Sequence, residues 1–216
     1  FKMFNRVSKW LLIALFAFVS NAQGIDTAAI KSFVVQSPEE YKNLADRFVQ
    51  ADTTLTVDEL TKVYYGAPFY KDFTFGKYDT QLAELYDNAE SAAEFDVVYL
   101  VAQKALNENP TSFDLTVKAI SGVCNGTDQS AQAQLENLRT RYANIYTVIS
   151  FSGNGVQPED PIYVTSQSDM LKYLAHCYGA VEILGESAIM DCKAIKVNRI
   201  DGDNMKEAII YVKIIN

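Results

Sequence analysis

Apolar positions divide the chain into two regions with different periods. From Ser37 to about Ser150, apolar residues recur at intervals of three and four, which places them on one side of an α-helix. From Pro161 onward, short runs rich in β-branched residues predict strands. The pattern therefore predicts an α+β fold, with a helical portion over about 25–152 and a small, mostly antiparallel sheet with one helix over about 160–216.

Local start signals support the first helices. Ser37 is a predicted N-cap ahead of Pro38, and Thr56 with Glu59 matches a capping box. A helical hairpin follows, and its spacing is similar to that of one tetratricopeptide repeat. The matching positions are Leu82, Leu85, Tyr86, Ala89, Val98, Ala102, Ala105 and Pro110. Because a single repeat cannot form a solenoid, ordinary hairpin packing and a repeat-like scaffold both stay open.

The stretch "SFSGNGVQPEDPIYV", residues 150–164, is predicted to be a structural turn. A helix is expected over 130–150, and Gly153 and Gly155 are expected to supply the left-handed backbone that ends it. Anion sites use the positive N-terminal end of a helix, whereas this loop follows the negative end and lacks the Lys and Ser/Thr of a phosphate loop. We therefore interpret the loop as a corner and not as a phosphate or metal site.

The C-terminal part shows hairpin signals. The segment "QSDMLKYLAHCYG" predicts a helix that stops at Gly179, and "DGDN" over 201–204 predicts a turn between two β-branched runs. The last run, "KEAIIYVKII", is apolar on both faces and is typical of a central strand. Before it, the alternation slips between Ala194 and Ile195, which predicts a bulge there.

Residues 1–22 have the pattern of a secretory signal peptide. Three basic residues precede the apolar run "WLLIALFAFV", and small residues follow it. The apolar run is about half of the ~20 residues that a bilayer crossing requires. We expect cleavage near Ala22, a mature single domain over 23–216 without a transmembrane segment, and a periplasmic or secreted location.

Charge narrows the class of partners. The chain has a formal net charge of −8, and loss of the three basic residues in 1–22 would leave 16 basic and 27 acidic residues, or −11. Lys and Arg are dispersed along the chain. An acidic surface repels phosphates, so we expect neither nucleic acids nor anionic membranes as partners.

Cysteine and histidine form no recognisable reactive pattern. The three cysteines, Cys124, Cys177 and Cys192, lack the spacing of metal ligands. Two of them could form one disulfide, or all three could be buried as free thiols. The single histidine, His176, precedes Cys177 on a predicted helix, where adjacent side chains point about 100° apart. We predict no catalytic residues, no metal site and no cofactor.

The aromatic stretch "YYGAPFYKDFTFGKY", residues 64–78, is the predicted binding surface. Its candidate residues are Tyr64, Tyr65, Phe69, Tyr70, Phe73 and Phe75. Aromatic side chains stack on sugar rings and dominate protein-binding surfaces. We expect at least one of the first two rings to pack inward, and two or more of the others to lie at the surface beside the C-terminal sheet. The alternative is a connection pinned to the core by its rings.

Four segments together resemble a known family. They are "DTTLTVDELTKVYYG" (52–66), "KALNENP" (104–110), "SGNG" (152–155) and "AIIYVKI" (208–214). With the signal peptide, they resemble the secreted family catalogued as domain of unknown function 4919, found in Gram-negative, largely gut-dwelling bacteria. The family's usual acid in the third segment is Asn154 here. The resemblance implies a location and a fold, and it supplies no site residues.

Two functions of different classes follow. The first is a noncatalytic secreted or periplasmic binding or scaffold module that uses the aromatic stretch to bind a protein or glycan. The second is a hydrolase with paired carboxylates, because such catalysis depends on the separation of two carboxyl groups in space and leaves no fixed sequence spacing. Two carboxyl groups facing each other across a cleft, one with a raised pKa, would favour the hydrolase.

Overall fold

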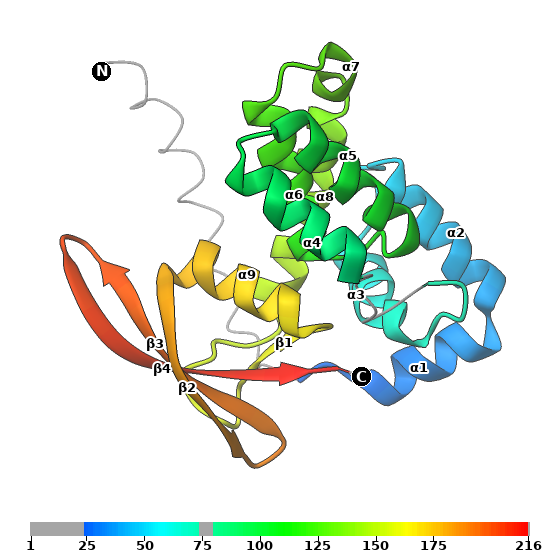
Figure 1. Cartoon of the computed structure of the whole chain (residues 1–216). Helices are drawn as coiled ribbons and strands as arrows, with labels where there is room; N and C mark the ends of the chain where they lie inside the picture. The colour runs from blue at the N-terminus through cyan, green and yellow to red at the C-terminus, as the bar shows by residue number, and fades with distance from the viewer. Residues whose placement is uncertain (1–23, 74–79, 216) are drawn as a thin grey trace, which may run out of the picture.

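The computed structural model describes residues 24–73 and 80–215 and has an α+β fold, as predicted (Figure 1). A helical portion comes first and a four-stranded mixed sheet with helix α9 follows. The elements are α1 Thr27–Gln36, α2 Pro38–Val49, α3 Val57–Gly66, the 3₁₀ turn η1 Ala67–Phe69, α4 Thr80–Ser91, α5 Phe95–Glu108, α6 Phe113–Asn125, α7 Gln129–Gln132, α8 Leu135–Ser150, β1 Ile162–Val164, α9 Gln167–Tyr178, β2 Ala180–Ile189, β3 Cys192–Asp201 and β4 Asn204–Ile214.

The first helices begin near the capping residues that the sequence predicts. The backbone N–H of Glu59 donates to the Thr56 hydroxyl, and the Glu59 carboxylate accepts from the Thr56 N–H at 2.7 Å, which completes the predicted capping box of α3. Ser37 precedes α2 as expected, although its hydroxyl makes no capping bond. The predicted helix over 130–150 is divided into the short α7 and the longer α8.

The corner between α8 and β1 uses its two glycines in different ways. Gly155 has a φ of +67°, as expected for a chain reversal, and its carbonyl accepts from Tyr211 on β4 at 2.9 Å. The expectation of a left-handed Gly153 is wrong. A Cβ at Gly153 would lie 2.0 Å from the carbonyl oxygen of Pro161, so this glycine permits a close approach of two backbone segments.

The sheet has the order β1-β4-β3-β2, in which β1 pairs with β4 in parallel and the other pairs are antiparallel. The central position of β4 confirms the prediction from its two apolar faces. Gly202, with a φ of +63°, makes the predicted hairpin turn between β3 and β4. The bulge expected between Ala194 and Ile195 is absent; the register shifts lie in β2, between Ala180 and Glu182 and between Ile183 and Gly185.

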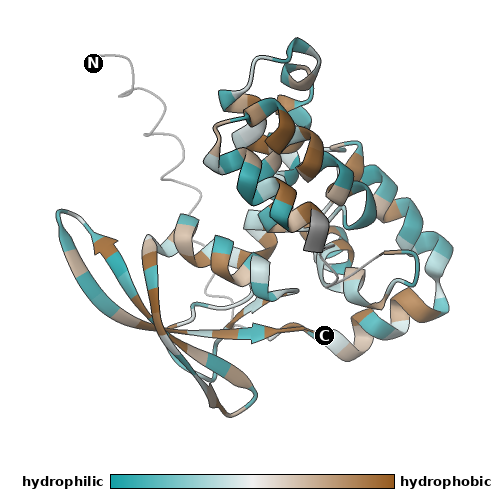
Figure 2. Ribbon diagram, in the orientation of Figure 1, coloured by the Kyte–Doolittle hydropathy of each residue, from teal (hydrophilic) through white to brown (hydrophobic). Residues whose placement is uncertain are grey.

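One apolar core extends from the helices into the sheet. It joins residues such as Tyr41, Phe48 and Ile149 of the helical portion with Ile195 and Ile210 of the sheet. Helix α9 packs against the sheet, and Figure 2 shows α2 mostly hydrophilic and α5 largely hydrophobic. In the described ranges, no helix combines the length and apolar character needed to cross a bilayer.

Helices α4 and α5 form the predicted hairpin. Leu82, Tyr86, Ala89 and Val98 pack together in it, whereas Leu85 is exposed. Ala102, Ala105 and Pro110 are buried as well, so seven of the eight repeat-like positions pack inward, as both ordinary hairpin packing and a repeat-like scaffold require.

Candidate functional site

The first two rings of the aromatic stretch are core residues. Tyr64 and Tyr65 on α3 are buried, and their hydroxyls reach the sheet portion. Tyr64 donates to the Asp169 carboxylate at 3.0 Å, and Tyr65 donates to the carbonyl of Tyr163 at 3.0 Å. These two rings fix α3 to α9 and β1, so they cannot form an accessible binding surface.

The following rings pack against helices instead of the sheet. Tyr70 is buried against Tyr41 of α2, with ring centroids 4.9 Å apart, and Phe73 packs on Tyr70 at 5.0 Å. Phe69 and Phe73 are half-buried, and the Lys31 ammonium of α1 lies over the Phe69 ring. The expected place beside the C-terminal sheet is thus wrong for these rings, because α1 and α2 cover them. Phe75 lies outside the described residues.

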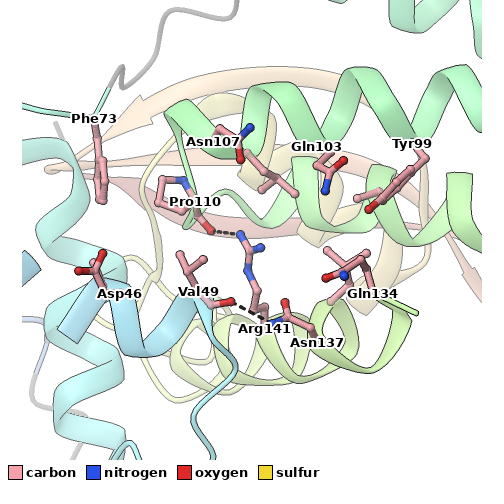
Figure 3. Close-up of a pocket in the computed structure, with 14 residues that line it drawn as sticks. Asp46, Val49, Phe73, Tyr99, Gln103, Asn107, Pro110, Gln134, Asn137 and Arg141 are labelled. Carbon is pink, nitrogen blue, oxygen red and sulfur yellow. Dashed lines mark hydrogen bonds between the residues drawn. The ribbon is translucent and has the colours of Figure 1, made fainter. Parts of the chain in front are cut away.

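One of the half-buried rings borders a pocket. This pocket lies between α2, α5 and α8 and has a volume of about 360 Å³ (Figure 3). Phe73 closes one end of it, and Tyr99 of α5 lies at the other end. The described lining residues are Ala45, Asp46, Val49, Phe73, Tyr99, Gln103, Leu106, Asn107, Pro110, Ala119, Gln134, Asn137, Leu138 and Arg141.

Arg141 is the charged group at the centre of this pocket. It rises from α8 into the middle of the pocket, between the other lining side chains (Figure 3). The residue is only 6% exposed. One Nη donates to the carbonyl of Pro110 at 2.5 Å, while Nε is buried without a hydrogen-bond partner. The guanidinium also lies 5.6 Å from the centre of the Phe48 ring.

Arg141 is buried without an acidic partner. No carboxylate oxygen of the described residues lies within 4.0 Å of its nitrogens. Desolvation lowers the pKa of Arg141 to about 10, so the guanidinium is still charged at neutral pH. A buried charge is normally paired, and no acidic partner for Arg141 is found in residues 24–73 and 80–215.

Four amide side chains also line the pocket. Gln103 and Asn107 come from successive turns of α5, and Gln134 and Asn137 come from the start of α8. Asn137 donates its amide N–H to the carbonyl of Val49 at 2.9 Å, which ties α8 to the end of α2 and leaves the amide oxygen free to accept. The pocket therefore offers donors and acceptors around a single buried cation.

The position of Arg141 along α8 is visible in the sequence. Leu138, Ile145 and Ile149 form the apolar side of α8, and Arg141 falls between them at steps of three and four. A charged residue on the apolar side of a helix is unusual and needs a partner or a role.

A second buried ionisable group, Asp169 of α9, is fully enclosed by donors. Its carboxylate accepts from the hydroxyls of Tyr64 and Ser112 and from the N–H of Asp114, at 3.0, 2.9 and 3.0 Å. Burial raises the pKa of Asp169, although the bonds from Asp114, Ser112 and Phe113 act in the opposite direction. Because Asp169 has no exposed surface, it is a structural link between α6 and α9 and not a group that meets a substrate.

The cysteines and the histidine form no reactive pair. All three cysteines are free: Cys124 is exposed, Cys177 half-buried and Cys192 buried. Burial raises the pKa of Cys177 to about 12, which leaves its thiol protonated at neutral pH. His176 is exposed at the end of α9, and no hydrogen bond joins it to a thiol. Over 24–73 and 80–215, no three His, Cys, Asp or Glu side chains gather to hold a metal.

Comparison with models of known protein families identifies the family of this chain. The family model for domain of unknown function 4919 (DUF4919) matches residues 28–211. The chain belongs to the DUF4919 family. The match covers every described helix and strand of the DUF4919 fold except the first residue of α1 and the last residues of β4. No curated protein and no solved structure matched the chain.

Proposed function

We propose that this DUF4919 protein is a secreted or periplasmic, noncatalytic binding module, and that the pocket between α2, α5 and α8 is its ligand site. The observation that carries the proposal is the composition of the pocket wall: amides, two aromatic rings and one guanidinium surround about 360 Å³. Binding sites of this size combine apolar walls with a few directed polar groups. Of the predicted aromatic surface, Phe73 contributes to this site.

The pocket supports binding over carboxylate catalysis. A hydrolase of the alternative kind needs two carboxyl groups that flank one bond. Among the described lining residues, Asp46 is the one carboxylate, and it pairs with Lys42 at 2.5 Å on the surface of α2. The carboxyl group with a raised pKa, Asp169, is enclosed by its own donors away from this pocket. The two groups do not face each other across the pocket.

Export is the second part of the proposal. It rests on the basic, apolar and small-residue pattern of residues 1–22. Intact-mass and N-terminal analysis of the protein from its native host should find a chain that begins near Gln23 in the periplasmic or culture fraction. A chain in the cytoplasm that retains residues 1–22 would contradict the proposal.

The binding part is tested by blocking the pocket. Immobilised wild-type protein is used in an unbiased pull-down from culture fluid and on a glycan array, beside Gln103→Trp, in which a ring fills the pocket entrance. Lys104→Trp is the matched control, because Lys104 is the next exposed residue of α5 and does not line the pocket. Ligands retained by wild type and Lys104→Trp but lost by Gln103→Trp support the proposal. Identical capture by all three proteins would contradict it.

A further inference from the structure

The buried guanidinium of Arg141 has unused binding capacity. An arginine side chain carries five N–H donors, and the described residues supply one hydrogen-bond acceptor, the carbonyl of Pro110. That carbonyl is neutral, so it satisfies a donor without balancing the charge. Arginine in protein interiors is typically matched by a carboxylate or phosphate in a two-bond geometry. The pocket side of Arg141 is where such a partner has room.

The charge of the pocket limits that partner to a single negative charge. Arg141 is the one cationic side chain among the described lining residues, and the charge of Asp46 is already balanced by Lys42 outside the pocket lining. The whole chain is acidic, with a net charge of −8. A doubly charged phosphate would leave one charge unbalanced in this environment, whereas a carboxylate matches the guanidinium charge for charge.

The side chains of the pocket walls indicate which other chemical groups the ligand has. Gln103 and Asn107 present amide groups from adjacent turns of α5, and Asn137 presents a free amide oxygen from α8. Such groups bind hydroxyl or amide groups of a ligand. Phe73 and Tyr99 offer ring faces at the two ends of the pocket (Figure 3). The volume of about 360 Å³ suits a molecule of the size of a sugar acid or an acylated amino acid.

We propose that the DUF4919 pocket binds a small organic ligand through one carboxylate, which pairs with Arg141, while amides of α5 and α8 hydrogen-bond to its neutral polar groups. This inference rests on the proposed function and narrows its ligand to the carboxylate class. Arg141 acts as the recognition residue, and Gln103 and Asn107 select among carboxylates.

The test uses matched acidic and neutral probes on the purified protein. Galacturonate is compared with galactose, and N-acetylalanine with N-acetylalaninamide, while inorganic phosphate forms a third arm. The Nε–H resonance of Arg141, assigned by its loss in Arg141→Met, is followed during each titration. The carboxylates should shift this resonance saturably, at affinities at least about tenfold higher than those of the neutral probes, a factor that a single charged pair easily supplies.

Two arginine variants assign the effect to this side chain. In calorimetric titrations, Arg141→Met should weaken carboxylate binding by about tenfold or more, and Arg141→Lys should retain part of it because the charge stays while the planar fork is lost. Arg139→Met is the control on the same helix, since Arg139 is exposed and paired with Glu136. It should bind as wild type does. If Arg141→Met fails to fold, Arg141→Lys provides the comparison.

The outcomes separate this inference from the proposed function. Equal binding of acidic and neutral probes would overturn the carboxylate pairing while leaving a pocket that binds. Binding of phosphate without carboxylates would overturn the ligand class. A flat response to every carboxylate probe would also overturn the inference, and the pull-down with Gln103→Trp would then decide independently whether the pocket binds anything.

Discussion

Two buried ionisable side chains of the DUF4919 fold differ in how they are satisfied. Asp169 lies between α3, α6 and α9, where hydroxyl and backbone donors surround its carboxylate. Arg141 lies between α2, α5 and α8, where one carbonyl accepts from its guanidinium and Nε has no partner. Both are almost completely removed from water, and among the residues that the structure describes only Asp169 finds the partners that burial requires.

The difference separates a structural role from a binding role. Burying a polar group costs free energy unless hydrogen bonds replace those to water, and a group that holds elements together is therefore satisfied within the chain. Asp169 meets this condition, since its donors come from α3, from the start of α6 and from Thr165 just before α9. Arg141 does not meet it, and its free side faces a pocket. The comparison predicts that substitution harms stability at Asp169 and binding at Arg141.

The largest expected loss is at Asp169. Asp169→Ala removes the acceptor for the hydroxyls of Tyr64, Ser112 and Thr165 and for the N–H of Asp114, so that four buried donors lose this partner. We expect the free energy of unfolding at neutral pH to fall by about 3–5 kcal/mol, the range for a broken buried polar network. Chemical denaturation measures this change in the free energy of unfolding. Asp191→Ala, at an exposed carboxylate paired with Lys213, should leave the midpoint near that of wild type. An equal loss of unfolding free energy in both variants would contradict a structural role for Asp169.

A smaller effect is expected when one donor is removed. Tyr64→Phe takes a hydroxyl from the Asp169 carboxylate, whereas Tyr65→Phe takes one from the neutral carbonyl of Tyr163. Hydrogen bonds to charged groups contribute about 1.5–3 kcal/mol, and those between neutral groups about 0.5–1.5 kcal/mol. Tyr64→Phe should therefore lower the unfolding free energy more than Tyr65→Phe does. The opposite order would show that the carboxylate does not dominate the contact between α3 and α9.

The pH dependence of stability gives a third and smaller signal. Burial raises the folded-state pKa of Asp169 above 3.8, so folding favours the protonated carboxyl. The part of the Asp169 contribution that depends on its protonation is full below the unfolded-state pKa and is lost as pH rises through the raised folded-state pKa. The unfolding free energy of wild type, measured relative to Asp169→Asn, should accordingly decrease from about pH 3 upward and then level off. A relative stability that increases with pH would reverse the assigned direction of the pKa shift.

Local chemistry made much of this fold predictable. The capping box at Thr56 and Glu59, the left-handed Gly179 and the Gly202 hairpin all depend on neighbours within a few residues, and the structure has each of them. Strand β2, residues 180–189, was not predicted. Its two register shifts break the alternation, and most of its side chains are exposed, so it carries no clear period.

The site was harder to predict because it depends on distant contacts. The aromatic stretch suggested a surface, but Tyr41, which lies well upstream on α2, provides the ring that buries Tyr70. Neither the pocket nor the missing partner of Arg141 can be seen without the packing of α2, α5 and α8. The sequence does place Arg141 on the apolar side of a helix. This position indicates that the residue has a special role, but it does not indicate which role.

The most direct test of this account is the stability of Arg141→Met without ligand. If no other group of the chain balances the guanidinium charge, then methionine removes a desolvated charge and keeps most of the packing, at the loss of one bond to Pro110 and of the contact with the Phe48 ring. Denaturation should give an unfolding free energy equal to wild type or up to about 2 kcal/mol higher, since apolar replacement of buried charges is often neutral or stabilising. A loss comparable to that of Asp169→Ala would show that Arg141 is structural, and would contradict the central distinction between the two buried charges.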